Sequence, residues 1–170
     1  HIQRMEKQLQ TVAHALKVSP EATPSRLKQM MERNHQLEKE VAALKSSLAS
    51  SGSDSLLDNV KEINDIKVLS ARMDDLDAGD LRDSIDHLKD RLGNAVVVLS
   101  SVDGEKVRIA VGVSKDLSTR IKAGTLVNFV ASQVGGKGGG RPDFAQAGGN
   151  RPDLLDEALS SVYGWVGDQT

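Results

Sequence analysis

Hydrophobic residues in the first third of the chain recur at alternating spacings of three and four, which is the seam of a heptad pattern. Pro20 and Pro24 divide this pattern into two, and Thr23 followed by Pro24 is typical of a helix start. The first seam consists of Ile2, Met5, Leu9, Val12 and Leu16. The second seam consists of Leu27, Met30, Asn34, Leu37, Val41, Leu44 and Leu48. We therefore expect residues 1–52 to form a coiled-coil-like arm of two helices.

Neither helix can bury its apolar stripe alone, because such helices gain most of their stability from packing. The pattern fits an antiparallel hairpin, a tethered coiled-coil pair or one half of a dimer bundle, and it does not choose between them. Asn34 interrupts the second seam with a polar group. It either fixes the register or partner number of a coiled coil, or faces solvent in an imperfect seam.

The pattern changes after a small, polar segment at residues 46–53, which we predict to be a linker. Beyond it, β-branched runs predict strands and stripes of helical period predict helices. The expected strands lie at 66–72, 95–99 and 107–113, with a hairpin at Asp103-Gly104, and the expected helices at 55–65, 80–92, 115–121, 124–134 and from Pro152 onward. This alternation predicts an α/β (α+β) globular domain over residues 53–170, with a central β-sheet and flanking helices.

Composition narrows the chemistry that this domain can carry. The 170 residues include no cysteine, which excludes disulfides, thiolate zinc sites and cysteine nucleophiles. The aromatic residues are one Trp, one Tyr and two Phe, so the core must consist of Val, Leu, Ile and Ala, and stacking of many bases is disfavoured. The chain has no run of the ~20 apolar residues that a membrane span needs, and its start lacks the apolar core of a signal peptide. We expect a cytoplasmic protein without membrane contact.

The net charge of -2 conceals an uneven distribution along the chain. Residues 114–151 are net positive, whereas residues 152–170 carry acidic side chains and no basic ones. The positive segment contains a glycine-rich stretch at residues 135–149. Glycine costs more ordering entropy than any other residue, so such a stretch inside a domain needs a reason. We predict a loop whose successive peptide N–H groups form a concave anion site.

Two cations within this stretch, Lys137 and Arg141, are suited to phosphate, and we expect Asp143 to orient the Arg141 guanidinium. The alternative is a flexible loop whose charges are merely solvated. The spacing matches neither the P-loop nor the dinucleotide fingerprint. The candidate nucleic-acid-binding residues are Gly135, Gly136, Lys137, Gly138, Gly139, Gly140, Arg141, Asp143 and Gln146, and the candidates for extending this surface are Lys115, Arg120, Lys122 and Arg151.

Longer motifs give the chain a specific resemblance. The stretch VGGKGGGRPDFAQAGG at 134–149, preceded by GVSKDLSTRIKAGTLVN at 112–128, resembles the C-terminal part of bacterial alanyl-tRNA synthetases. Earlier segments agree in order: KVSPE at 17–21, LEKEVAALK at 37–45, KVLSARMD at 67–74, LRDSIDHLKDRLG at 81–93 and VVVL at 96–99. The resemblance covers essentially the whole chain, with Phe144 standing where methionine is expected.

The resemblance implies a non-catalytic domain that holds the tRNA(Ala) elbow, helps both catalytic sites act on one tRNA and can mediate homodimerisation. The parent ligase would attach alanine with ATP, use Mg and Zn, and clear mischarged serine and glycine at sites before His1. The rest of that synthetase chain is the implied partner, and no cofactor is implied for this segment. Its globular half is similar to the domain that follows the DHH phosphoesterase core. The related glycine motif there ends in His, whereas Arg141 follows the third glycine here, which favours binding.

Two other functions stay open at this point. A phosphoesterase needs convergent carboxylates or histidines, but the histidines are scattered over helical segments. Asp74, Asp75 and Asp77 fit an acidic turn better than a cation site, so we assign no catalytic residue and no metal ligand. The other alternative is a purely structural dimerisation module built on the two seams. We expect Tyr163 and Trp165 to pack the last helix rather than stack on a base.

Overall fold

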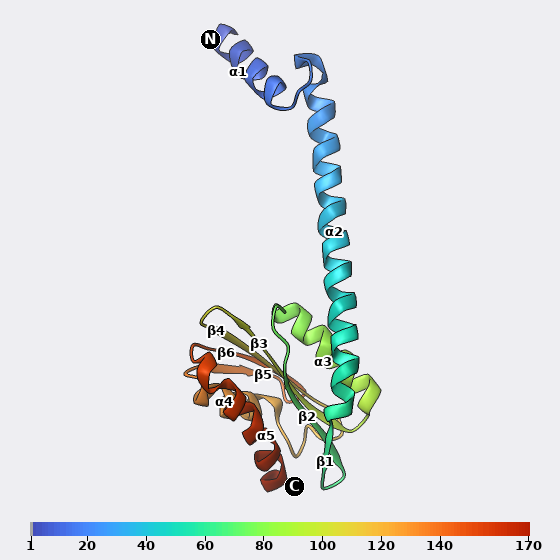
Figure 1. The fold of residues 1–170 in the computed structure, drawn as a ribbon, viewed down its shortest axis with the longest axis vertical. Coiled ribbons are helices and arrows are strands. Elements are labelled where there is room, and N and C mark those ends of the chain that lie inside the picture. Colours follow the sequence, from blue (N-terminus) through green and yellow to red (C-terminus); the bar gives the residue numbers. More distant parts are fainter. Residues whose placement is uncertain (1) are drawn as a thin grey trace. The chain divides into compact units, whose positions relative to one another are not determined.

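The computed structural model describes residues 2–170, apart from the side chains at positions 49 and 50 (Figure 1). The chain divides into two compact units between Leu44 and Lys45. The first unit contains α1 (Ile2–Ala15), the 3-10 helix η1 (Pro20–Ala22) and most of α2 (Thr23–Leu56). The second contains the end of α2 and a sheet domain. A helical arm followed by an α/β domain is therefore confirmed.

The apolar seams of the arm are exposed to solvent. Leu16, at the end of the first seam, is half-buried, and the exposure of the other large apolar seam residues ranges from 42% at Leu37 to 74% at Ile2. α1 packs mainly against η1, where Ala13 and Thr23 are buried, and Thr23 is itself the first helical residue of α2. The antiparallel hairpin, one of the three arrangements that the pattern allows, is therefore not formed within the described residues. Asn34 donates to Glu38 one turn away at 3.1 Å.

α2 runs without a break through residues 46–53, so the predicted linker is wrong. Serine is an indifferent helix former, and packing decides its conformation here. Ser53 is fully buried, and Leu56 and Leu57 pack against the hydrophobic cluster beneath α3 (Ala78–Leu92). The Asp54 carboxylate also contacts His87 of α3 at 2.9 Å, which holds the pKa of Asp54 below its ordinary value.

The second unit is built around a six-stranded sheet with the strand order β1-β2-β3-β4-β6-β5. Its strands are β1 (Lys61–Ile63), β2 (Ile66–Arg72), β3 (Ala95–Asp103), β4 (Lys106–Val113), β5 (Lys137–Gly140) and β6 (Phe144–Gly149). β2 and β3 pair in parallel through the α3 crossover, and the other neighbouring strands pair antiparallel. This mixed sheet with flanking helices confirms the predicted fold class.

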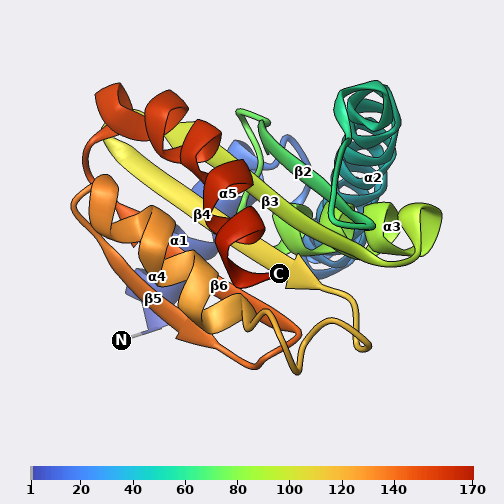
Figure 2. The same cartoon turned by 90° about the horizontal axis from the view of Figure 1, so that it is seen from below.

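Helices cover both faces of the sheet (Figure 2). α3 packs on one face, and α4 (Ala123–Gln133) and α5 (Leu155–Gln169), the latter preceded by η3 (Pro152–Leu154), pack on the other. In β3, Val96 and Val98 face α4 and α5, whereas Val97 and Leu99 face α3. Burial on both faces explains why β3 reads as a continuous apolar run. Trp165 packs against Phe129 with ring centroids 5.8 Å apart, in the packing role expected for it.

Two short helices predicted from the sequence are wrong. Instead of a helix at 55–65, η2 (Leu57–Asn59) leads into β1, and the positive φ angles of Asn64 and Asp65 make a two-residue hairpin to β2. Residues 115–121 form turns rather than a helix. The hydroxyl of Ser114, just before these turns, accepts from the Ala95 N–H at 2.9 Å and so ties the end of β4 to the start of β3.

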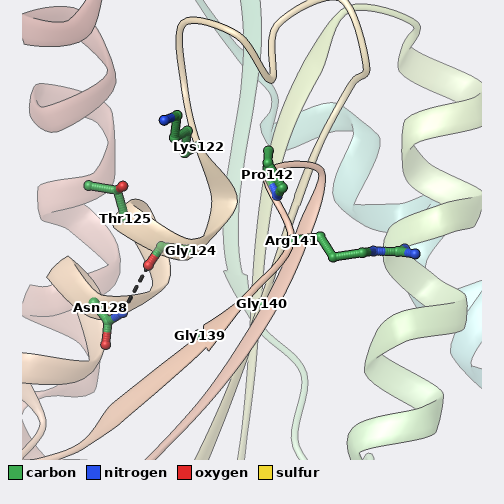
Figure 3. Close-up of a pocket in the computed structure, with 8 residues that line it drawn as sticks. All are labelled: Lys122, Gly124, Thr125, Asn128, Gly139, Gly140, Arg141 and Pro142. Carbon is green, nitrogen blue, oxygen red and sulfur yellow. Dashed lines mark hydrogen bonds between the residues drawn. The ribbon is translucent and has the colours of Figure 1, made fainter.

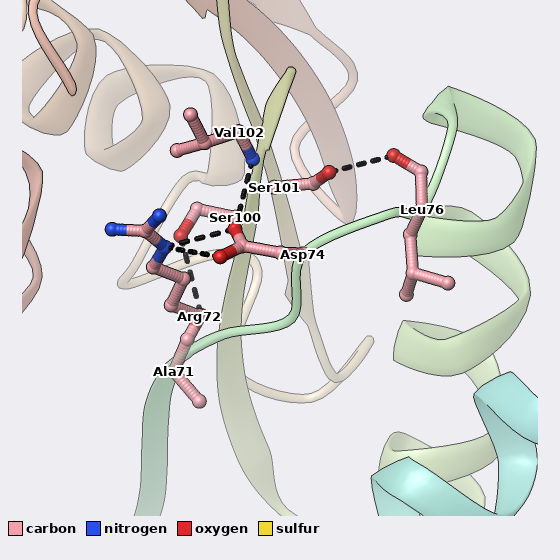
Figure 4. A network of polar contacts seen from close by, with 7 residues as sticks. All are labelled: Ala71, Arg72, Asp74, Leu76, Ser100, Ser101 and Val102. Atoms are coloured by element: carbon pink, nitrogen blue, oxygen red, sulfur yellow. Dashed lines mark hydrogen bonds and ion pairs between the residues drawn. The ribbon is translucent and has the colours of Figure 1, made fainter. Parts of the chain in front are cut away.

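The aspartates between β2 and α3 hold a turn together, as the sequence predicts (Figure 4). Asp74 accepts from Arg72 Nε at 2.8 Å and from the Val102 N–H at 3.1 Å. The hydrogen bond from Arg72 is the main reason that the pKa of Asp74 lies below its ordinary value. Asp77 caps α3 by accepting the Asp80 N–H at 2.8 Å, and the Asp80 carboxylate accepts the Asp77 N–H in return. These carboxylates are therefore engaged in structural roles.

We predict that Asp77→Ala lowers the free energy of unfolding by about 1 kcal/mol at neutral pH, because the helix cap is lost. The Asp80 N–H holds the pKa of Asp77 below its ordinary value of 3.8. A carboxylate with a lowered folded-state pKa contributes stability above its unfolded pKa and loses it as pH falls through the folded value. The difference between variant and parent should therefore shrink below about pH 4, as measured by urea unfolding.

Asp77→Asn is the matched control, because it keeps an oxygen acceptor at the cap without a titrating carboxyl. It should retain most of the stability at neutral pH. Equal unfolding midpoints for Asp77→Ala and the parent would contradict the prediction.

Candidate nucleic-acid interface

The glycine-rich stretch forms a β-hairpin at the edge of the sheet, so the predicted loop at residues 135–149 is wrong. β5 is the last strand of the sheet and pairs antiparallel with β6 along its whole length. The Arg141 N–H donates to the Phe144 carbonyl at 2.8 Å and closes the turn. Gly135, with a φ of 73°, ends α4 in a left-handed turn, in which the Gly136 N–H donates back to the last turn of the helix.

Close approach of the backbone explains most of the glycines at positions 136–140. A Cβ added at Gly136, Gly138 or Gly140 would collide with carbonyl oxygens of β6. Gly139 differs, because a Cβ added there would meet no atom within 4 Å. Packing against β6 thus requires glycine at positions 136, 138 and 140, whereas nothing in the packing requires glycine at position 139.

The peptide N–H groups do not form the single hollow that the sequence predicts. Gly136 and Arg141 donate theirs to carbonyls of the chain, and the Gly138 N–H donates to Asn128 Oδ1 at 3.0 Å. Alternate N–H groups of an edge strand point away from the partner strand. Gly138 and Gly140 both fall on this outer side of β5. Asn128 accepts the Gly138 N–H, so the Gly140 N–H is the outward-facing group of β5 that borders open space.

A groove of about 510 Å³ lies between this outer edge of β5 and the start of α4 (Figure 3). The N-cap residue of α4, Lys122, makes no side-chain cap, and the Ala123 N–H donates to Pro142 at 2.9 Å. Peptide N–H groups in the first turn of a helix carry partial positive charge and attract anions. The groove is lined by Lys122, Gly124, Thr125, Asn128, Gly139, Gly140, Arg141 and Pro142.

The Arg141 side chain leaves the groove and points away from Thr125 and Asn128 (Figure 3). Its Nε lies 3.3 Å from Asp143 Oδ1, as expected for a carboxylate that orients it. The Arg141 side chain is still 67% exposed, so the pairing leaves most of its N–H donors open to solvent. Arg141 contributes its main chain to the groove and its charge to the other side of the hairpin.

A second, smaller hollow of about 270 Å³ contains Lys137 and Gln146, beside Arg108. Gln146 Nε2 donates to the Ala78 carbonyl at the start of α3 at 2.9 Å, which ties the hairpin to that helix. Lys137 and Gln146 therefore lie together, but not in the groove that Lys122 lines.

The remaining candidate cations are not brought to the groove. Arg151 pairs with Asp153 at 3.1 Å near the opposite end of the hairpin, and this hydrogen bond holds the pKa of Asp153 below its ordinary value. Arg120 donates to the Thr170 carbonyl at 3.5 Å. Lys115 lies in the turns after β4. Of the four outlying cations proposed from the sequence, Lys122 lines the groove.

Four residues of the groove were not predicted: Gly124, Thr125, Asn128 and Pro142. The first three lie in the first two turns of α4, where Asn128 Nδ2 also donates to the Gly124 carbonyl at 3.0 Å. A glycine and an asparagine spaced four apart at a helix start were the available signal. That α4 would lie against the glycine strand could not be known from its own sequence.

Among residues 2–170, no three His, Asp or Glu side chains gather closely enough to hold a metal ion. None of the described helices is both long and apolar enough to cross a bilayer.

Comparisons with known proteins agree with one another. Residues 65–168 match the model of the DHHA1 domain family. The alanine–tRNA ligases of Methylibium petroleiphilum and Polaromonas naphthalenivorans are both 50% identical to this chain, over 169 and 166 residues, or 99% and 98% of it. The chain spans 19% of the length of each of these relatives. The C-Ala domain of Aquifex aeolicus alanyl-tRNA synthetase superposes with a TM-score of 0.60 at 30% identity, covering 64% of this chain and 97% of that domain.

We predict that substitution by alanine destabilises the fold at Gly138 and leaves its stability almost unchanged at the adjacent Gly139. Gly138→Ala should destabilise the fold by about 2 kcal/mol or more, because its Cβ collides with the backbone of β6. Gly139→Ala should change the free energy of unfolding by no more than about 0.5 kcal/mol, because its Cβ enters open space. Urea unfolding of the two variants measures the difference, and equal destabilisation would show that the hairpin geometry is wrong.

Proposed function

Because the chain belongs to the DHHA1 family, and within it to the C-Ala domains of alanyl-tRNA synthetases, we propose that it is a non-catalytic tRNA-binding domain of an alanine–tRNA ligase. Its role is to hold the elbow of tRNA(Ala), so that the aminoacylation and editing sites act on one tRNA. The parent ligase, in the cytoplasm, attaches alanine with ATP and clears mischarged serine and glycine. Its ATP, Mg²⁺ and Zn²⁺ are bound by other parts of the ligase.

The observation that carries this proposal is the groove between α4 and β5. Lys122 lies at the N-cap of α4, where a positive side chain opposes the helix dipole and gains nothing from it. An anion bound in the groove would offset this unfavourable interaction between Lys122 and the helix dipole, because the anion attracts both the Lys122 ammonium and the peptide N–H groups of the first turn. Gly139 and Gly140 let the backbone of a ligand approach without meeting a side chain.

RNA phosphodiester groups fit these requirements better than a small anion does. The groove lies on one side of the hairpin, and the exposed Arg141 guanidinium lies on the other side. Folded RNA is recognised largely through its shape, phosphates and 2′-hydroxyls, and phosphate contacts position the protein without reading bases. The surface offers cations and backbone amides.

We predict that Arg141→Ala and Lys137→Ala each weaken tRNA(Ala) binding, and Lys122→Ala likewise, by about tenfold at moderate salt. Each loss removes a phosphate contact, so the slope of log Kd against log salt should fall by about 1. Fluorescence anisotropy of labelled tRNA across a salt series measures both quantities. Gly139→Val should weaken binding as well, because it adds a side chain to the face of the hairpin that Gln146 and Arg141 share, while the chain stays folded.

Arg91→Ala is the matched control, because it removes an exposed arginine from the far end of α3. An acceptor-stem minihelix that lacks the elbow should bind much more weakly than intact tRNA(Ala), and footprinting should show protection at the elbow. Equal affinity for the minihelix would contradict elbow recognition, and unchanged affinity of the three cation variants would remove the hairpin from the interface.

The exposed seams support a second role, homodimerisation through the arm. An apolar hollow of about 490 Å³ on α2 is lined by Leu27, Met30, Met31, Arg33, Asn34 and Leu37. Apolar side chains spaced as a heptad seam are stabilised when a second helix covers them. We propose that the arm of a second copy does so, which makes the tRNA-binding unit dimeric.

We predict that sedimentation equilibrium of the 170-residue chain gives a dimer at micromolar concentrations, and that Leu37→Glu shifts it to monomer. The charged side chain would have to be desolvated in the seam. Lys39→Glu, which lies off the seam on the same helix, should leave the association unchanged. A chain that stays monomeric at high concentration would contradict the proposed dimer.

A further inference from the structure

Arg82, in the second turn of α3, lies over the ring of Phe144. Its guanidinium carbon is 4.9 Å from the ring centroid, within the range of a cation–π contact. Phe144 is 9% exposed and begins β6, directly after the hairpin turn, whereas Arg82 is exposed to solvent. The ring therefore contacts the guanidinium of a side chain that is otherwise exposed to solvent.

This contact places Arg82 on the same side of the hairpin as the Arg141 side chain. Arg141 and Phe144 form the hydrogen-bonded pair that closes the turn, and side chains of a directly opposed pair lie on one face. Gln146, two residues further along β6, shares that face and bonds to the start of α3. The face of Arg141, Phe144 and Gln146 is thus the face that α3 covers.

The nearby carboxylates leave Arg82 uncompensated. Asp143 pairs with Arg141, and Asp86, one turn after Arg82 on α3, pairs with Lys89 at 3.2 Å. None of the ion pairs found within residues 2–170 involves Arg82. Two exposed arginines, of which Arg82 takes part in no ion pair of residues 2–170, therefore flank the hairpin turn on the α3 side.

We propose that Arg82 and Arg141 form a second binding site for an RNA phosphodiester, on the opposite face of the hairpin from the groove at α4. The bound RNA then contacts both faces of the glycine hairpin, with Lys122 and the α4 start on one side and the two arginines on the other. Arginine suits this site because its planar group can lie flat on the ring and still donate two parallel hydrogen bonds to a phosphate. This inference rests on the proposed tRNA-binding function.

The test uses the 170-residue chain and anisotropy of labelled tRNA(Ala) over a potassium chloride series. Arg82→Gln should weaken binding about fivefold to tenfold and reduce the salt slope by about 1. Arg91→Gln, an equal loss of charge at the other end of the same helix, should stay within about twofold of the parent. Arg82→Lys should recover only part of the affinity, because it keeps the charge without the planar donors.

Phe144→Leu tests whether the ring positions Arg82. It removes the aromatic face and keeps an apolar side chain in the cluster, and thermal unfolding reports whether the fold is kept. The substitution should weaken tRNA binding in the parent and have little further effect in the Arg82→Gln background. Equal effects in both backgrounds would show that the ring does not act through Arg82.

The outcomes separate this inference from the function it rests on. If Arg141→Ala weakens tRNA binding and Arg82→Gln does not, the second site is wrong and the proposed function stands. If Arg141→Ala, Lys122→Ala and Arg82→Gln all bind tRNA as tightly as the parent does, the hairpin is not part of the interface and the second site fails. If the parent chain itself does not bind tRNA(Ala), the proposed function fails. The Arg82 variants change an exposed side chain, so their result does not depend on Phe144→Leu being folded.

Discussion

The packing of β5 against β6 is the constraint on which the rest of the site depends. The two backbones lie so close that Gly136, Gly138 and Gly140 cannot be replaced by any residue with a Cβ unless β6 moves. This approach lets a strand almost without side chains complete the sheet and form one wall of a groove. The ordering entropy of so many glycines is unfavourable. It is offset by the hydrogen bonds of the hairpin and by the packing of α4 and β6 around it.

An edge strand exposes unpaired backbone groups, which natural sheets usually cover or blunt. The two outward-facing N–H groups of β5 differ in whether the fold covers them. Asn128 of α4 covers the outward N–H of Gly138, whereas the Gly140 amide borders the groove at the start of the same helix. The fold thus protects one half of the edge and leaves the other half beside Lys122. The position of α4 therefore leaves part of the β5 edge open to a ligand and prevents another strand from pairing with it.

The elements predicted correctly from the sequence are those whose evidence is local. α3 and α5 have a helical periodicity that persists for several turns, and β3 is a continuous β-branched run, so their buried residues follow from those patterns. The helix through Ser53 was missed because its burial by α3 outweighs its polar composition, and β1 because a strand of three residues has no period. Glycine disfavours strands, so only pairing with β6 makes one of residues 137–140. Lys137 and Arg141 could be named from the motif, but Asn128 reaches the site through tertiary packing alone.

The cations of the sheet domain differ in whether a carboxylate neutralises them. Three ion pairs lie away from the hairpin turn and join residues close in sequence: Arg72–Asp74, Arg108–Asp103 and Arg151–Asp153. Arg141 pairs with Asp143 at the turn itself, and Lys89 pairs with Asp86 within α3. Exposed pairs of this kind contribute little to stability. Lys122, Lys137 and Arg82 take part in none of the ion pairs of residues 2–170, and they surround the glycine hairpin on both of its faces. The fold gains nothing from bringing these charges together, because like charges at close range repel. The proposed contact with an extended polyanion, which would touch several of these cations at once, gives their grouping around an accessible backbone a reason.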